Sequence, residues 1–306
     1  MQIKSAFSNL MIKALTESLD VRSMTKIADR LIPNYNIYKR TGFPENIPIQ
    51  KQDAAKQIVK DIIASNLLLE FVNQLIYYHT EGYMGKKYRI NHLKAIIMEI
   101  EDHGLIYDQV NRMFVEDPDV RRARNWGTLR EGEDYIFAFL RLDIVGNTKL
   151  VQQYPENLIK QTYSDLRGIV QRCIDKRNGR IWNWEGDGGL VAFYFSNKNF
   201  YATLSGMEII HDLFIYNQVK CPLDKPVSAR LAIHGGPCAY CSNEEDLKKI
   251  DLIKKLIEIE SKYTKPNSLT ISNVIKTSLD PQLSMHFLPV EGAGSNEHYN
   301  YQLRWE

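Results

Sequence analysis

The chain has 306 residues, of which 44% are apolar, and its formal net charge at pH 7 is +2. This length is enough for two domains with real cores, and the near-neutral charge does not favour binding to nucleic acid or to an anionic membrane. No apolar run approaches the roughly 20 residues that a membrane-spanning helix needs. The N-terminus lacks the layout of a signal peptide, and four cysteines do not make a disulfide framework. We therefore expect a soluble cytoplasmic protein with no nucleic-acid or membrane partner.

The first third of the chain is predicted to be helical. Apolar residues recur at helical spacing in Ile3–Arg30, Asp53–Tyr78 and Asn91–Asp102. Prolines and glycines predict a loop between the first two stretches. We expect an N-terminal helical segment over 1–44 and a small helical domain over 45–108. The small domain has no helix carrying a base-reading set of Arg, Asn and Gln, so packing, sensing or dimerisation is favoured over DNA binding. It resembles the helical effector-associated modules of bacterial defence proteins.

A charged stretch with little apolar periodicity follows the helical part. It predicts a domain boundary, and we place a linker over 109–134. Its arginines, Arg121, Arg122 and Arg124, could meet a triphosphate, although a solvated linker face is the simpler interpretation.

Strands and helices alternate from Tyr135 onward. The predicted strands are Tyr135–Ile144, Arg180–Glu185, Gly189–Phe195, Val227–His234, Ser268–Ile271, Met285–Val290 and Tyr299–Leu303. The predicted helices are Lys149–Arg177, Asn199–Asn217 and Asp246–Tyr263. The order β-α-β-β-α-β, with antiparallel hairpins and crossover helices, indicates an α+β domain of ferredoxin-like topology over 135–306.

Two carboxylates stand where predicted strands end. Asp143 lies near the end of its strand, within Phe-Leu-Arg-Leu-Asp-Ile-Val-Gly-Asn-Thr, and Asp187 lies at a hairpin tip, within Trp-Asn-Trp-Glu-Gly-Asp-Gly-Gly. Magnesium is usually bound through one or two carboxylates plus substrate phosphates, and the N–H groups of a glycine turn can hold phosphates. The pair therefore predicts a site for a metal-bound polyphosphate. Taken alone, either residue could be structural, as a strand-end cap or an ordinary turn residue.

Five motifs follow one another in the order and spacing of a known family. They are Leu142-Asp-Ile-Val-Gly-Asn-Thr, Trp184-Glu-Gly-Asp-Gly, Leu231-Ala-Ile-His-Gly-Gly-Pro, Asp251-Leu-Ile-Lys-Lys-Leu, and Leu288-Pro-Val-Glu-Gly-Ala-Gly with Tyr299-Asn-Tyr-Gln-Leu. Together they resemble class III nucleotidyl cyclase catalytic domains, and the resemblance covers about 135–304.

The resemblance implies a head-to-tail homodimer of palm-type domains that binds a nucleoside triphosphate at the interface. It implies that Asp143 and Asp187, with the carbonyl of Ile144, hold two divalent ions, Mg²⁺ or Mn²⁺. The ribose 3′-hydroxyl would then attack the α-phosphorus, and pyrophosphate would leave. The backbone that would grip the phosphates belongs to Val145, Gly146, Asn147 and Thr148.

The departures from the family pattern concern the residues that read the base and the triphosphate. Arg141 replaces the usual Phe, and Asn183 replaces the Lys of adenylate or the Glu of guanylate cyclases. The usual Asn and Arg of the later helix become Asp251 and Lys255, and Lys255 keeps the positive charge without the guanidinium fork. Ala293 replaces a lysine of the closing turn. Lys254 or the linker arginines could supply the missing contacts, and the helix alignment could be shifted by one turn.

These replacements resemble the pyrimidine cyclases of Pycsar anti-phage systems, which make cyclic UMP or cyclic CMP for a separate effector protein. Arg141 offers only donors to the carbonyls of uracil, and the amide of Asn183 can both donate and accept. We therefore expect UTP as the preferred substrate, ahead of CTP. The alternatives are an adenylate or guanylate cyclase, and a catalytically silent cyclase-like nucleotide sensor. A diguanylate cyclase is disfavoured because the hairpin tip lacks the second acidic residue.

Arg141 and His234 allow simpler structural interpretations. Arg141 could form a salt bridge with Asp143 or Glu185 as readily as contact a base, and His234 is expected to be a buried strand histidine. Alternation along the strand predicts that Trp182 and Trp184 face the core while Asn183 faces the cleft.

Overall fold

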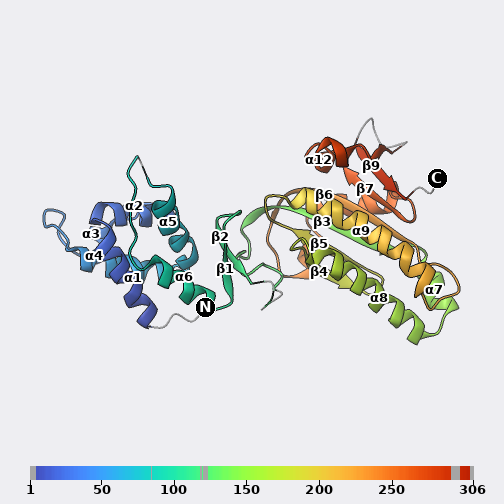
Figure 1. Ribbon diagram of the computed structural model, residues 1–306, viewed down its shortest axis with the longest axis horizontal. Coiled ribbons are helices and arrows are strands. Elements are labelled where there is room, and N and C mark those ends of the chain that lie inside the picture. The colour runs from blue at the N-terminus through green and yellow to red at the C-terminus, as the bar shows by residue number, and fades with distance from the viewer. Residues whose placement is uncertain (1–4, 84, 118, 120–122, 291–296, 304–306) are drawn as a thin grey trace. The chain divides into compact units, whose positions relative to one another are not determined.

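The computed structural model describes residues 5–303 apart from 84, 118, 120–122 and 291–296. The chain forms two compact units, coloured blue to teal and green to red in Figure 1. Met1–Arg121 and Trp126–Thr128 form the N-terminal unit, and Arg122–Asn125 and Leu129–Glu306 form the C-terminal unit. The linker arginines Arg121 and Arg122, for which phosphate contact was the alternative interpretation, lie outside the described residues. The replaced turn residue Ala293 lies outside them as well.

The N-terminal unit is helical and ends in a small β-hairpin. Its elements are α1 (Ser5–Ser18), α2 (Val21–Leu31), α3 (Ile37–Thr41), α4 (Lys51–Ala64), α5 (Leu68–Thr80), α6 (Leu93–Glu101), β1 (Leu105–Asp108) and β2 (Met113–Glu116). One core runs through all of them, with Met11, Leu15, Phe71 and Phe114 almost completely buried. The helices before and after residue 45 therefore share a single hydrophobic core.

Two of the long helices predicted in this unit are broken. Helix α2 begins anew at Asp20, whose carboxylate accepts a hydrogen bond from the Ser23 N–H at 2.7 Å, an N-cap that interrupts the predicted Ile3–Arg30 helix. Asn66, with φ +55°, separates α4 from α5 within the predicted Asp53–Tyr78 helix. The β1–β2 hairpin was not predicted, and β2 lies inside the predicted linker.

The C-terminal unit is a mixed sheet with helices on both faces. Its strands are β3 (Asp134–Ile144), β4 (Arg180–Glu185), β5 (Gly188–Phe193), β6 (Ala229–Ala239), β7 (Ser268–Ser272), β8 (Leu288–Pro289) and β9 (His298–Gln302). Its helices are α7 (Asn147–Gln153), α8 (Glu156–Asp175), α9 (Lys198–Val219), α10 (Glu244–Leu247), α11 (Asp251–Glu258), the π-helix η1 (Ile259–Tyr263), α12 (Asn273–Lys276) and α13 (Pro281–Ser284). The strand order is β4-β5-β3-β6-β7-β9-β8, and β6–β7 is the only parallel pair among the strands that the structure describes. The predicted α+β fold is confirmed.

Two of the helices predicted for this unit are each divided into shorter helices. The predicted Lys149–Arg177 helix is divided into α7 and α8 at Pro155. The residue before a proline is disfavoured in the helical region, and Tyr154 is accordingly extended (φ −120°, ψ 150°). The predicted Asp246–Tyr263 helix is divided into α10, α11 and η1.

The central strand β3 is covered on both faces. Leu140, Leu142 and Ile144 join the core beneath α8 and α9, the two long helices that lie along the sheet in Figure 1. Phe137, Phe139, Arg141 and Asp143 alternate with them and face the other side. Arg141 and Asp143 therefore share one face with the buried aromatic residues that precede them.

Trp182 is completely buried, as predicted, but it lies on the same face as Asn183 and does not alternate with it. The β4–β5 register shifts between Ile181 and Asn183, which is a β-bulge. Trp182 consequently packs on Phe137 and Phe139 of the face that carries Arg141, with ring centroids 5.0 and 5.2 Å apart. Asn183 turns to that same face, as expected for a residue lining the cleft.

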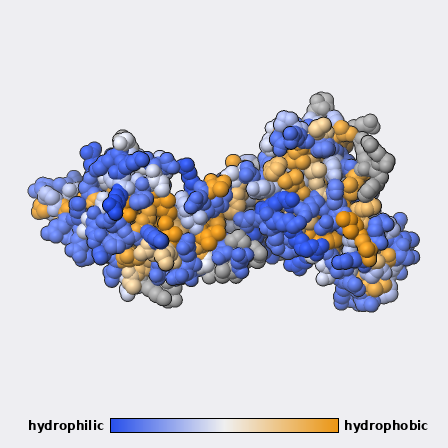
Figure 2. All heavy atoms as spheres, in the orientation of Figure 1, coloured by the Kyte–Doolittle hydropathy of each residue, from blue (hydrophilic) through white to orange (hydrophobic). Residues whose placement is uncertain are grey.

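The surface seen in Figure 2 is mainly hydrophilic, with smaller apolar patches. None of the described helices is long and apolar enough to cross a membrane.

Candidate active site

Asp143 and Asp187 lie together at one end of the central strands. Asp143 is opposite Gly188 of β5 in the sheet register, and Asp187 immediately precedes Gly188 in the turn between β4 and β5. The Ile144 N–H donates to the Asp187 carbonyl at 3.2 Å, which ties the hairpin tip to the end of β3. Two carboxylates that are 44 positions apart in the sequence thus reach the same pocket.

The pocket that contains both carboxylates is small. Its volume is about 190 Å³, and its polar lining includes Arg141, Asn183 and Glu185. Ile253 and Ile257 of α11 close it on the side away from the sheet. Pockets for small molecules usually have volumes of roughly 300–1,000 Å³, so this single-chain pocket is smaller than an ordinary small-molecule site.

The electrostatics of the pocket favour a cation beside Asp187. Burial, together with the nearby charge of Asp143, raises the pKa of Asp187 above its usual value. Two carboxylates that repel each other in a partly buried site are stabilised by a bound cation. The described residues contain no cluster of three or more potential metal-binding side chains. Two carboxylates plus substrate phosphates suit Mg²⁺ or Mn²⁺, so this donor set fits the expected ions.

A chain of ion pairs extends from Asp143 into the protein. Arg230 donates from Nη2 to Asp143 Oδ2 at 2.8 Å. Glu260, whose side chain is only 3% exposed, accepts from Arg141 Nε at 3.3 Å. Its other oxygen lies 2.7 Å from Arg230 Nε, close enough for an ion pair although the angle is not that of a hydrogen bond. Arg141 therefore pairs with Glu260 rather than with the predicted Asp143 or Glu185.

Arg230 and Glu260 were not among the site residues predicted from the sequence. Arg230 stands directly opposite Asp143 in the β3–β6 register, so it could have been found only once that pairing was known. Glu260 lies in η1, where burial raises the pKa of its carboxyl even though two guanidinium groups oppose the shift. A π-helical turn adds one residue per turn and often marks a functional position.

The hairpin side of the pocket is polar and internally connected. The Asn183 side-chain amide donates to Glu185 Oε1 at 3.2 Å, and Lys248 Nζ donates to the same oxygen at 2.6 Å. Asn183 and Arg141 line the pocket together, as the predicted base-reading pair would require.

Only some backbone N–H groups of the loop after β3 are free to bind phosphates. The Val145 N–H donates to the Ser228 carbonyl at 2.8 Å, so it is already occupied. Gly146, with φ +72°, leads into α7, and the Asn147 side chain accepts from the Tyr163 hydroxyl. Within the described part of the chain, no backbone acceptor is found for the N–H groups of Gly146, Asn147 or Thr148.

The structure does not bring Asp251 and Lys255 into this pocket. The Asp251 side chain is 97% exposed and pairs with Lys254 at 2.9 Å. Lys255 is exposed on α11 and lies near His234, whose pKa its charge helps to lower. In place of these residues, α11 presents Ile253 and Ile257 to the carboxylates.

His234 is a buried strand residue, as predicted. Its Nδ1 lies 2.8 Å from Ser272 Oγ. His234 pairs with Phe139 in the sheet, so its side chain lies on the face that carries Arg141. Burial lowers its pKa to about 4.

Comparison with known proteins gives structural similarities only. No family model and no curated protein matches the sequence. The guanylate cyclase domain of RhGC from Catenaria anguillulae in complex with GTP is 15% identical, with a TM-score of 0.45, covering 56% of this chain and 100% of that one. An adenylate/guanylate cyclase/hydrolase from Silicibacter pomeroyi is 16% identical, with a TM-score of 0.46, covering 56% of this chain and 99% of that one. The adenylyl cyclase CyaB from P. aeruginosa is 16% identical, with a TM-score of 0.45, covering 57% of this chain and 96% of that one.

Proposed function

We propose that this protein is a nucleotidyl cyclase that converts a pyrimidine nucleoside triphosphate, UTP ahead of CTP, into the 3′,5′-cyclic nucleotide and pyrophosphate. The observation that carries the proposal is the meeting of Asp143 and Asp187 in one pocket that also contains Arg141 and Asn183. Two carboxylates suit metal-bound phosphates, and the other two side chains offer the hydrogen-bonding groups that a pyrimidine edge requires.

The roles follow from the position of each group. Asp143, Asp187 and the Ile144 carbonyl would hold two divalent ions, Mg²⁺ or Mn²⁺, which supply charge stabilisation for the triphosphate and acidify the ribose 3′-hydroxyl. The N–H groups of Gly146, Asn147 and Thr148 would face the phosphates.

Arg141 is anchored through Nε to Glu260, which leaves its terminal N–H groups to donate to the O2 carbonyl. Asn183 would complement the opposite side of the base.

The small pocket also supports a homodimer. Asp251 and Lys255 lie on α11 outside this pocket, so in a head-to-tail dimer they would meet the substrate bound by the other protomer. On the resemblance to the anti-phage pyrimidine cyclases, we place the product as a second messenger for a separate effector protein in antiviral defence.

The test is turnover of all four nucleoside triphosphates at equal concentration in one tube, with Mn²⁺ or Mg²⁺ and chromatography of the products. Cyclic UMP is expected to exceed cyclic CMP, with little purine product. Cyclic AMP or cyclic GMP as the main product would refute the pyrimidine assignment, and cyclic CMP would refute only the order of UTP and CTP.

Variants test the role of the carboxylates. Asp143→Ala and Asp187→Ala should each leave less than about a tenth of the wild-type rate, because each removes part of one charge-stabilising site. Glu156→Gln is the matched control, since Glu156 is an exposed acidic residue of α8 that pairs only with Lys160 among the described residues. Binding of a triphosphate without any turnover would favour the silent nucleotide sensor.

A further inference from the structure

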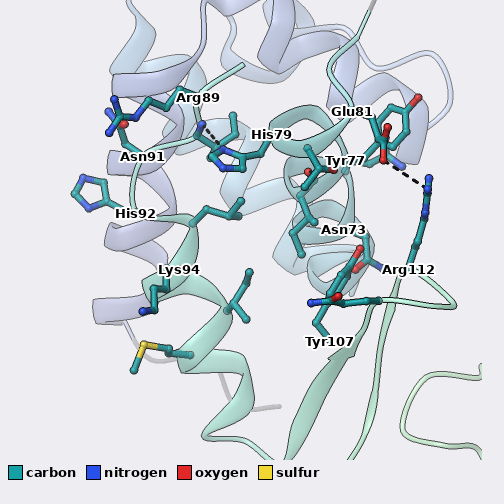
Figure 3. Close-up of a pocket in the computed structure, with 18 of the residues that line it drawn as sticks. Asn73, Tyr77, His79, Glu81, Arg89, Asn91, His92, Lys94, Tyr107 and Arg112 are labelled. Carbon is teal, nitrogen blue, oxygen red and sulfur yellow. Dashed lines mark hydrogen bonds and ion pairs between the residues drawn. The ribbon is translucent and has the colours of Figure 1, made fainter. Parts of the chain in front are cut away.

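A large hollow lies in the N-terminal unit, which the proposed cyclase chemistry does not use. It has a volume of about 1020 Å³ and lies between α5, residues 89–92, α6 and the end of the β1–β2 hairpin. Figure 3 shows Arg89, Asn91, His92 and Lys94 along one side, and Tyr77, Tyr107 and Arg112 along the other. We call it the α5–α6 pocket. This volume is at the upper end of the range for small-molecule sites.

Its lining combines an apolar floor with a few polar groups. Ile76, Ile90 and Leu93 are almost completely buried and line it, and Tyr77 exposes 41% of its surface at the rim. The Tyr107 ring is held edge-on by Phe114 at a centroid distance of 5.3 Å. Apolar walls with two accessible phenol rings suit a flat ring system, because aromatic pairs prefer stacked or edge-on arrangements.

Two polar side chains in the pocket could bind a ligand, one by accepting a hydrogen bond and the other by donating one. Asn73 Oδ1 is buried without a hydrogen-bond partner among the described residues, and an unpaired buried acceptor is costly. His79 Nδ1 accepts from the Ile90 N–H at 3.1 Å, so its Nε2 carries the proton and is a fixed donor. The pocket therefore has one acceptor that lacks a donor and one donor aimed by the backbone.

The lining carries the cations Arg89, Lys94 and Arg112 and the carboxylates Glu81 and Glu101, so its net charge is positive. Arg112 pairs with Glu81 at 3.5 Å, and His92 pairs with Glu17 at 2.9 Å. Arg89 and Lys94 have no carboxylate within ion-pair distance among the described residues. These two cations match the one or two negative charges of a single phosphate and fall short of the charge of a triphosphate.

We propose that the α5–α6 pocket binds a mononucleotide. The base would lie against Tyr77 and Tyr107 and donate a hydrogen bond to Asn73, and the phosphate would meet Arg89 and Lys94. This site does not depend on the cyclase assignment, because every group in it belongs to the N-terminal unit.

The experiment is calorimetric titration of the full-length Asp143→Ala chain in EDTA, which suppresses metal-dependent nucleotide binding at the carboxylate pocket. The probes are the four 5′-monophosphates, 3′,5′-cyclic AMP, GMP, CMP and UMP, the free nucleosides, and inorganic phosphate. At least one mononucleotide is expected to bind about tenfold or more tightly than both its nucleoside and phosphate, because the pocket contacts both parts.

Variants assign that binding to the pocket. Arg89→Gln and Asn73→Leu should each weaken it about tenfold, as expected for the loss of one buried or charge-assisted hydrogen bond. Asn73→Leu should also raise the midpoint of thermal unfolding, because it removes a buried amide oxygen that has no donor among the described residues. Lys87→Gln, an exposed cation of the neighbouring loop that does not line the pocket, should leave affinity unchanged.

Three results would overturn the proposal. The first is the absence of binding by every mononucleotide up to millimolar concentration. The second is a nucleotide affinity equal to that of phosphate or of the nucleoside. The third is mononucleotide binding that neither Arg89→Gln nor Asn73→Leu weakens.

Discussion

Gly188 is the residue at which backbone packing most directly controls the candidate active site. It pairs with Asp143 in the sheet and follows Asp187 in the chain. A Cβ at this position would lie 2.3 Å from the Leu142 carbonyl oxygen and 3.1 Å from Asp143 Cα. Since a close carbon–oxygen contact is about 3.3 Å, the Gly188→Ala variant must move the hairpin tip by about 1 Å relative to β3.

This displacement separates the two carboxylates, so its cost should appear in catalysis more than in stability. A misplacement of about 1 Å can cost roughly 10²-fold in rate, whereas overpacking costs about 1–3 kcal/mol of stability. The assay is cyclic nucleotide formation at saturating Mn²⁺, with circular dichroism to show that the variant is folded. We expect a loss of about 10²-fold in rate.

Gly132→Ala is the matched control for a glycine substitution. Gly132 has φ +78° and open space around its Cβ position, so alanine there meets backbone strain but no clash. It should lose stability of the same order and keep its turnover. A folded Gly188→Ala variant with more than about half of the wild-type rate would show that the tip tolerates the displacement, and that the two carboxylates do not act as one site.

Three further predictions concern the interface, the buried glutamate and pH. Mixing inactive Asp143→Ala chains with inactive Lys255→Ala chains should restore turnover, because one site of the mixed dimer is complete; heterodimers without activity would place the whole site within one chain. Glu260→Gln should lower the ratio of pyrimidine to purine products about tenfold, because Arg141 loses its charged anchor, and an unchanged ratio would show that Glu260 does not position it. The folded-state pKa of His234 is about 4 against 6.5 unfolded, so the unfolded chain takes up the proton first as the pH falls. The free energy of unfolding should therefore decrease by about 3 kcal/mol between pH 6.5 and 4 through this group. Urea titrations should show a smaller decrease in His234→Gln, and an identical pH dependence would contradict the buried neutral histidine.

Local pattern was sufficient to predict where the two carboxylates stand. Asp143 ends an apolar strand, and Asp187 occupies a Gly-Asp-Gly tip between two strands, so both positions depend on residues within a few places in the chain. The α+β class followed for the same reason, because strand and helix periods are local properties. The continuity of the helices was predicted less well, because helices end and begin again at Asp20 and Pro155, inside stretches with apolar residues at helical spacing.

Tertiary structure determines which side chains surround the two carboxylates. Arg230 reaches Asp143 only because β6 pairs with β3 in one register, between residues 87 positions apart. The bulge at Trp182 and the π-helical turn at Glu260 each alter the direction of a side chain, and neither leaves a periodic signal in the sequence. Sequence by itself therefore determined which acidic residues come to the strand ends, because that placement needs only local geometry. Their charged partners depend on register and helix rotation, which only the packed sheet and its covering helix determine.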